Sequence, residues 1–330
     1  MCRYPRAAVG PCSLDGVIAL LAPGQGSQTP GMLTPWLDGN GSLGSAEETL
    51  ARWSESTGLD LRRLGTVAGA DEIKDTAVTQ PLVVATALLA ADRLTARIEL
   101  PTAAPAAGHS VGELAAAAVA GVLTPDAAVA LAAVRGREMA AACALEPTGM
   151  SAVLGGKPED VLARLAELGL DPANRNGAGQ VVAAGPVSAL TTLAENPPER
   201  ARVIPLPVAG AFHTRFMAPA EEALRAHTEG ISPADPVRPL LSNADGNVVK
   251  DGADALRRLV TQVTRPVRWD SCMAALRELG VTAVIELPPA GTLVGLVKRE
   301  LKGTATLALK TPDDLDAAVT LIAEHAGAEK

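Results

Sequence analysis

A serine between two glycines is the strongest chemical signal in this 330-residue sequence. Ser110 lies in Gly108-His109-Ser110-Val111-Gly112, the Gly-x-Ser-x-Gly pattern of a nucleophile elbow, between a small-residue segment (103–107) and a strong helix former beginning at Glu113. Glycine on both sides permits the strained backbone and close packing of such a turn. Because the serine would face a helix N-terminus, free backbone N–H groups there can stabilise negative charge. We interpret Ser110 as a candidate nucleophile; a chance glycine-rich turn is the alternative.

A serine nucleophile needs a base, and the sequence contains four histidines. His213 follows a predicted strand in a small-residue loop and is the best candidate, with an ordinary surface position as the alternative. His227 and His325 lie in polar or charged segments typical of a protein surface. His109 adjoins the serine, but side chains diverge at an elbow, so we expect it to shape the pocket. No carboxylate stands out as a third member, which predicts a Ser–His dyad whose imidazole is oriented by a neutral carbonyl.

Arg135 is the second unusual residue, at the edge of the apolar face of a helix predicted from about Pro125 to Cys143. A buried guanidinium requires an anionic partner. That partner could be Glu138 or Glu113 of the chain itself, which the spacing alone favours. It could also be a substrate carboxylate, which an arginine binds through two parallel hydrogen bonds.

The composition is that of an ordinary globular protein and argues against several classes of function. It is 48% hydrophobic, 20% charged and only 2% aromatic, with a net charge of −8 and no polybasic block. We therefore expect neither nucleic acid nor membrane as a partner. The four cysteines have no metal-ligand spacing, which predicts no metal and a reduced, cytoplasmic protein without disulfides. No apolar run is long enough to span a bilayer, and residues 1–15 are interpreted as a loose extension.

Alternating apolar runs and helical patterns predict an α/β fold around a parallel sheet. The larger pattern has predicted strands at 17–21, 240–241, 281–287 and 304–309. Helices are predicted at 45–58, 79–98, 125–143, 254–263, 269–279 and 291–301. Between Met150 and Val208 the elements shorten to strands at 151–154, 180–184 and 203–208 and helices at 158–169 and 186–195.

These elements predict two domains beyond the extension. Residues 16–147 and 209–330 are expected to form a large α/β-hydrolase-like domain with a parallel sheet core. Residues 148–208, with their β-α-β-α-β order, are expected to form a small inserted ferredoxin-like subdomain.

Eight short motifs, taken in chain order, resemble those of the malonyl-CoA:acyl-carrier-protein transacylases, within the acyltransferase family of fatty-acid and polyketide synthesis. The resemblance extends from about Val17 to Leu309. No single motif is specific, whereas all eight in family order are. The motifs are Pro23-Gly24-Gln25-Gly26-Ser27-Gln28, Thr79-Gln80-Pro81, Gly108 to Glu113, Arg135-Gly136-Arg137-Glu138-Met139, Gly179-Gln180-Val181-Val182, Ala211-Phe212-His213-Thr214, Leu241-Ser242-Asn243 and Pro266-Val267-Arg268-Trp269.

The resemblance assigns roles to the residues that carry the reaction. Ser110 resembles the acyl-accepting nucleophile and His213 its base. Arg135 resembles the clamp for the malonyl carboxylate, which replaces the internal ion pair as the expectation. Gln25 and the backbone N–H of Val111 resemble the oxyanion hole.

Further residues are expected to shape the site. The main-chain carbonyl of Gln262 resembles the group that orients the histidine. Gln80 and His109 are expected to line the pocket. Phe212 resembles the residue of malonyl-selecting members, where methylmalonyl-selecting members carry a small one. One departure is the stretch from Glu286 to Gly291, where the family more usually has Gly-Pro-Gly.

The implied activity is transfer of a malonyl group from malonyl-CoA to the phosphopantetheine thiol of acyl carrier protein, by a ping-pong reaction without a cofactor. A monomer is the default for the resembled family. Two enzymatic alternatives remain: a serine thioesterase or esterase of the α/β-hydrolase type, and a polyketide extender-unit acyltransferase. A non-catalytic subunit that docks a carrier protein is the third alternative.

Overall fold

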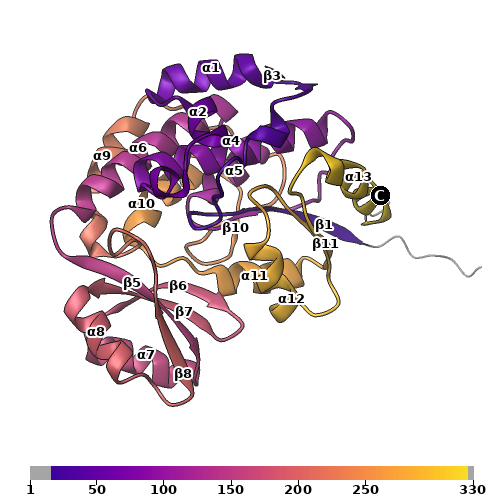
Figure 1. Ribbon diagram of the computed structural model, residues 1–330. Helices are drawn as coiled ribbons and strands as arrows, with labels where there is room; N and C mark the ends of the chain where they lie inside the picture. The colour runs from indigo at the N-terminus through magenta and orange to yellow at the C-terminus, as the bar shows by residue number, and fades with distance from the viewer. Residues whose placement is uncertain (1–15, 326–330) are drawn as a thin grey trace, which may run out of the picture.

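The computed structural model describes residues 16–325, so the extension predicted at 1–15 lies outside the described residues. The chain builds a six-stranded sheet surrounded by helices and a separate four-stranded sheet, seen at the lower left of Figure 1. A short two-stranded ribbon, β2 (Asn40–Gly41) with β3 (Gly44–Ser45), completes the strands of this region.

The six-stranded sheet has the order β10-β9-β4-β1-β11-β12. Its strands are β1 (Val17–Ala22), β4 (Ala106–Gly108), β9 (Leu240–Leu241), β10 (Val248–Val249), β11 (Val281–Glu286) and β12 (Ala305–Ala308). Central β1 pairs in parallel with β4 and β11, and only the edge pair β9–β10 is antiparallel. A continuous apolar run such as Val17–Ala22 is typical of a strand buried on both faces. The predicted α/β class with a parallel sheet core is therefore confirmed.

The two faces of this sheet are covered by different helices. Ile18 and Leu20 of β1 point into one apolar cluster with α4, α5 and α6, whereas Ala19 and Leu21 point into another with α11 and α12. These helices are α4 (Thr76–Thr95), α5 (Gly112–Val119), α6 (Pro125–Cys143), α11 (Trp269–Glu278) and α12 (Thr292–Glu300). The other helices of this region are α1 (Ala46–Thr57), α2 (Leu61–Thr66), α3 (Ala70–Ile73), α9 (Ala218–Thr228), α10 (Gly252–Thr261) and α13 (Leu315–His325). Short 3-10 turns are η1 (Thr34–Trp36), η2 (Arg215–Met217), η3 (Gln262–Thr264) and η4 (Pro312–Asp314).

Helix starts depend on capping side chains. The predicted cap at Ser45 forms a complete capping box with Glu48 at the start of α1. The prediction for α4 was wrong by one turn, because Asp75 caps the helix and Pro81 lies inside it. Among the residues described, α4 is the one helix long and apolar enough to cross a membrane by length and composition, and 89% of its most apolar window is buried inside the fold.

The four-stranded sheet has the order β6-β7-β5-β8, with every neighbouring pair antiparallel. Its elements follow in the order β5 (Thr148–Gly155), α7 (Pro158–Glu167), β6 (Asp171–Gly177), β7 (Gln180–Pro186), α8 (Val187–Glu195) and β8 (Ala201–Pro205). The sequence prediction missed β6, whose residues are mostly polar or small. This strand is formed by its pairing with β7 and by two backbone hydrogen bonds with Val267 of the larger unit: the N–H of Arg175 donates to the carbonyl of Val267, and the N–H of Val267 donates to the carbonyl of Ala173.

Candidate active site

Ser110 lies on a sharp turn between β4 and α5, the strand–turn–helix path expected for its motif. Its φ of 54° is in the left-handed region, a strained conformation for a residue with a side chain. A Cβ atom at Gly108 would lie 2.0 Å from the carbonyl oxygen of Gly112, and one at Gly112 would lie 2.3 Å from that of Ala22. Only glycine fits at either position, and the turn presses tightly against the end of β1.

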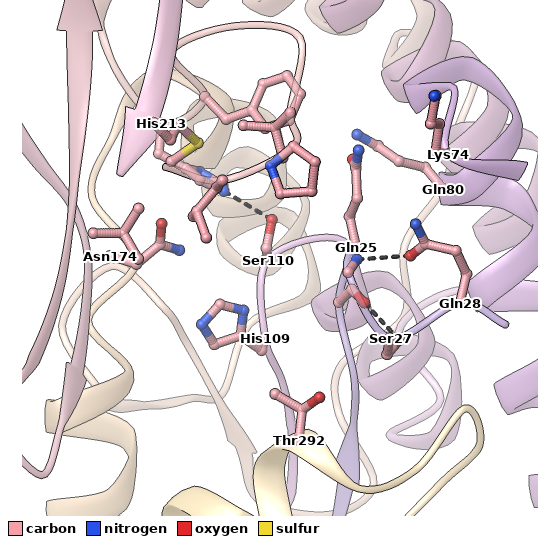
Figure 2. Close-up of a pocket in the computed structure, with 18 of the residues that line it drawn as sticks. Gln25, Ser27, Gln28, Lys74, Gln80, His109, Ser110, Asn174, His213 and Thr292 are labelled. Carbon is pink, nitrogen blue, oxygen red and sulfur yellow. Dashed lines mark hydrogen bonds between the residues drawn. The ribbon is translucent and has the colours of Figure 1, made fainter. Parts of the chain in front are cut away.

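Ser110 and His213 form a hydrogen-bonded pair at this turn (Figure 2). The Oγ of Ser110 lies 2.8 Å from Nε2 of His213, and Nδ1 of His213 lies 2.8 Å from the main-chain oxygen of Gln262. Because a carbonyl only accepts, Nδ1 carries the proton and Nε2 is left with a lone pair toward the serine hydroxyl. Within residues 16–325 no carboxylate hydrogen-bonds to this imidazole.

His213 is held neutral by its surroundings. Only 3% of its surface is exposed. Burial, and then the positive charge of Arg135, lower its pKa to about 3. A neutral imidazole with its lone pair facing a hydroxyl is the form that can remove the serine proton.

Arg135 of α6 is buried behind the serine with neutral partners. Its Nη1 donates to Oε1 of Gln80 at 2.6 Å, while Nη2 donates to Oε1 of Gln262 at 2.8 Å and lies 3.4 Å from Oγ of Ser110. Burial lowers its pKa to about 10, and the charge of Glu113 opposes that shift. The guanidinium therefore remains cationic at neutral pH.

The internal ion pair that the helical spacing favoured is not formed. Among the described residues no carboxylate lies within 4.0 Å of the Arg135 guanidinium, and Glu138 pairs with Arg137 at 2.9 Å instead. Arg137 and Glu138 are partly exposed, whereas Arg135 is 2% exposed and turned into the protein. The buried cation thus has hydrogen-bond partners but no directly bound counter-charge.

Asn243, which follows β9, supports the elbow and was not predicted as a site residue. Its Oδ1 accepts the backbone N–H of Ser110 at 2.9 Å, and its Nδ2 donates to the carbonyl of Gly108 at 2.7 Å. It is fully buried. Asn243 belongs to one of the motifs that resemble the family, and this was its only sequence signal. No local pattern could reveal its contact with Ser110, because the two residues are 133 positions apart.

The Gln25 loop and the start of α5 supply two free backbone donors near the serine. The N–H of Ser110 is occupied by Asn243, whereas those of Gln25 and Val111 donate to no acceptor within the described part of the chain. The loop lies against the elbow, because a Cβ atom on Gly24 would be 2.5 Å from the carbonyl oxygen of His109. The Gln25 side chain is turned away and donates to Thr76 at 3.1 Å.

The Ser110–His213 pair and the Gln25 loop face a cavity of about 580 Å³ between the two sheets (Figure 2). His109, Ser110, Phe212 and His213 line it together with Gln80. Arg135 and Gln262 form the layer directly behind the lining residues. Other lining residues come from the four-stranded sheet and α12: Met150, Asn174, Asn176, Gln180, Val182, Thr292, Leu293 and Leu296.

His109 forms part of the wall rather than contacting the serine hydroxyl. Its Nε2 lies 2.8 Å from Oδ1 of Asn176 on β6, and its ring packs edge-on against Trp269 with centroids 5.6 Å apart. Burial lowers its pKa, so the ring is neutral. The contact joins the elbow to the strand that the sequence analysis missed.

The fold and this serine–histidine geometry are those of an enzyme that forms an acyl ester on a serine, and the comparisons give the family. The protein-family model for the acyl transferase domain matches residues 20–324, so the chain belongs to that family. A curated relative from Mycobacterium tuberculosis, named malonyl CoA-acyl carrier protein transacylase, is 59% identical over 301 residues, covering 91% of this chain and 98% of that protein.

Solved structures agree with this assignment. The crystal structure of the transacylase from Mycobacterium tuberculosis has a TM-score of 0.87 at 58% identity, covering 91% of this chain and 99% of that one. A malonyl-transacylase solved in complex with a type II polyketide acyl-carrier protein has a TM-score of 0.84 at 29% identity, covering 93% and 100% of the two chains.

Proposed function

We propose that this protein transfers a malonyl group from malonyl-CoA to the phosphopantetheine thiol of acyl carrier protein, through a malonyl ester on Ser110. The carrying observation is that Ser110 and a neutral His213 line one cavity, while the Arg135 guanidinium, which has no bound carboxylate, lies directly behind the serine. The family membership and the names of the relatives support the same reaction.

In the first half-reaction, Ser110 attacks the thioester carbonyl while His213 Nε2 takes the hydroxyl proton. The new C–O bond drives the carbonyl electrons onto oxygen, and the free N–H groups of Gln25 and Val111 hold that oxyanion. Losing one such donor typically lowers kcat by roughly 100- to 1000-fold. Collapse of the intermediate breaks the C–S bond, and protonated His213 returns the proton to the departing CoA thiolate.

Arg135 selects the free carboxylate of the malonyl group. Its Nη1 is now occupied by the side-chain oxygen of Gln80, a neutral acceptor that also lines the cavity. We propose that the malonyl carboxylate replaces that amide oxygen and forms the charge-assisted pair that the buried guanidinium lacks. Phe212 and His109 limit the width of the acyl pocket.

In the second half-reaction the carrier-protein thiol enters the position that CoA has left. Neutral His213 removes the thiol proton as sulfur attacks the malonyl ester, and the same oxyanion hole serves again. Breaking the ester bond returns the proton to Ser110. The carbonyl of Gln262 keeps the imidazole in the required tautomer through both halves.

A serine thioesterase or esterase is the competing proposal, because the elbow serves hydrolysis equally well. It gives Arg135 and the small subdomain no role. Incubation with labelled malonyl-CoA alone separates the two: a stable labelled protein supports transfer, whereas continuous release of free malonate supports hydrolysis. Adding a holo carrier protein should then move the label onto the carrier.

The choice between a fatty-acid and a polyketide carrier is decided by rates with the two carriers. We propose the fatty-acid pathway; curated relatives that are 59% identical carry the name malonyl CoA-acyl carrier protein transacylase, without a polyketide carrier in the name. Comparable or faster transfer to a polyketide carrier would favour an extender-unit acyltransferase instead.

We propose that the larger unit, residues 16–147 and 209–330, has an α/β-hydrolase-like architecture. The elbow between β4 and α5 of a largely parallel sheet supports this. We propose that residues 148–208 are a ferredoxin-like insertion, as their βαββαβ element order and antiparallel sheet suggest. A cytoplasmic monomer remains the prediction for location and assembly.

A further inference from the structure

Glu113 is a buried carboxyl group at the site to which the proposed reaction gives no role. It lies in the first turn of α5 and is 3% exposed. Its Oε1 accepts the backbone N–H of Asn243 at 2.8 Å, and its Oε2 accepts a hydrogen bond from the side-chain amide of Gln262. A buried carboxyl that accepts two N–H donors is arranged as an acceptor on both oxygens.

The side-chain amide of Gln262 has only one orientation that satisfies its neighbours. Its oxygen faces Nη2 of Arg135 at 2.8 Å, while its nitrogen faces Glu113, the carbonyl of Ser110 at 3.0 Å and Oδ1 of Asn243 at 3.1 Å. Reversing the amide would place N–H groups against a guanidinium and an oxygen against three acceptors. Arg135 and Glu113 therefore fix the same orientation from opposite sides.

In this Glu113–Gln262–Arg135 relay, the carboxyl group and the guanidinium lie on opposite sides of one amide and do not bind each other. Burial raises the pKa of Glu113 to about 7, and the hydrogen bonds from Asn243 and Gln262 favour its ionised form. A carboxylate directly on Arg135 would occupy the donors that a substrate carboxylate needs and would offset the guanidinium charge. A neutral amide oxygen holds the guanidinium in place without an ion pair.

We propose that Glu113 is a positioning residue for the malonyl clamp: by fixing the Gln262 amide, it holds the Arg135 guanidinium behind Ser110 and available to a substrate carboxylate. This inference rests on the proposed function. It concerns selection of the malonyl group and leaves the Ser110–His213 pair unaltered.

The first test is Glu113→Gln, assayed by loading of Ser110 from malonyl-CoA and from acetyl-CoA. A glutamine offers one acceptor oxygen, so it cannot accept from both Asn243 and Gln262. The KM for malonyl-CoA should rise roughly tenfold, the size expected for one lost charge-assisted hydrogen bond, with kcat little changed. Loading from acetyl-CoA, which has no carboxylate, should change less than about threefold. Glu138→Gln makes the same change on a partly exposed residue of α6. It should leave both the KM for malonyl-CoA and the loading from acetyl-CoA unchanged.

The second test asks whether Glu113 acts through Gln262. Gln262→Met removes the relay but keeps the main-chain carbonyl that contacts His213. It should reproduce the malonyl-specific rise in KM, and the double variant Glu113→Gln with Gln262→Met should add little to it. If Glu113→Gln does not fold, Glu113→Asp, which keeps the carboxyl group but shortens its reach toward Gln262, carries the substrate comparison.

Equal losses with both acyl donors, an unchanged KM for malonyl-CoA, or additive effects in the double variant would each overturn the inference. Failure of the proposed function is recognised separately, because the wild-type protein would then fail to load malonyl, or would release it as free malonate without passing it to the carrier. If the wild type loads malonyl and the Glu113→Gln variant has the same KM for malonyl-CoA, only the role of Glu113 is contradicted.

Discussion

Burial controls the charge states of the side chains around Ser110. His213 is neutral because desolvation and the nearby Arg135 both disfavour its protonated form. Its Nδ1 is oriented by the carbonyl of Gln262, which is a neutral group and supplies no negative charge. Arg135 keeps its charge despite being buried, because a guanidinium starts from so high a pKa. The site thus combines a base that is ready at neutral pH with a cation that lacks a bound anion.

We predict that His213 does not titrate between pH 8 and pH 5, because its folded pKa of about 3 lies well below that range. NMR spectra of ¹⁵N-histidine-labelled protein should keep the signals of the neutral Nδ1–H tautomer throughout. Assignment by comparison with His213→Gln identifies the resonance. A protonation step near pH 6.5 would contradict this electrostatic picture.

The same lowered pKa makes folding stability depend on pH with a defined sign. The unfolded chain takes up a proton at this histidine near pH 6.5 and the folded chain does not, so the contribution is present above pH 6.5 and lost as the pH falls toward 3. Between pH 6.5 and 5 the wild type should lose about 1.6 kcal/mol of unfolding free energy more than His213→Gln. Denaturant unfolding at the two pH values measures the difference; equal losses would show a histidine that is not buried neutral.

Replacing Arg135 should change which acyl group is accepted. In Arg135→Ala the malonyl carboxylate loses its cation while the Ser110–His213 pair is kept. The preference for malonyl-CoA over acetyl-CoA should fall on the order of 10- to 100-fold, the range of a charge-assisted hydrogen bond. Competition between the two donors for Ser110 measures this ratio, and an unchanged ratio would remove Arg135 from substrate selection.

Secondary-structure elements position these side chains through close backbone contacts. The site depends on β4 and α5 meeting at the elbow, on α4 crossing α6, and on η3 bringing Gln262 to the histidine. Gly136 lies where α6 crosses α4, next to Arg135, and a Cβ atom there would be 2.6 Å from the carbonyl oxygen of Thr76 and 3.3 Å from Cβ of Gln80. The close approach of α6 to α4 beside Arg135 therefore needs glycine at this crossing.

We predict that Gly136→Ala pushes α6 away from α4 and disturbs the contact between Arg135 and Gln80. Overpacking of this kind costs about 1–3 kcal/mol of stability, and the KM for malonyl-CoA should rise with it. Gly295→Ala is the matched control, because a Cβ atom on this α12 glycine meets nothing within 4 Å. The control should stabilise the protein by about 0.5–1 kcal/mol. Thermal unfolding and malonyl loading of both variants provide the comparison.

Local sequence patterns predicted the elements whose caps and turns are determined by residues close by in the sequence. Ser45 and Gly108 mark a cap and a turn that depend on residues a few positions away, and both lie where expected. Strand β6 has no apolar alternation, and it forms through contacts with β7 and Val267 that no local pattern encodes. The start of α4 was predicted at residue 79, one turn too late, because Asp75 caps the helix before that position.

At the scale of the whole molecule, the cavity depends on parts of the chain that are distant in sequence. The large unit supplies the candidate nucleophile, the candidate base and the buried cation, while β5, β6 and β7 of the four-stranded sheet form the opposite wall (Figures 1 and 2). The candidate nucleophile, base and clamp could be proposed from short motifs and a family resemblance. The link from Glu113 to Gln262 could not, because it joins residues 149 positions apart and depends on the orientation of one amide.

The most direct measurement is peptide mapping by mass spectrometry after the protein is mixed with malonyl-CoA and then with a holo carrier protein. The account predicts one malonyl group on the peptide containing Ser110, no adduct in Ser110→Ala, and movement of that group onto the carrier thiol. A malonyl group on another residue, or free malonate released with none reaching the carrier, would contradict it.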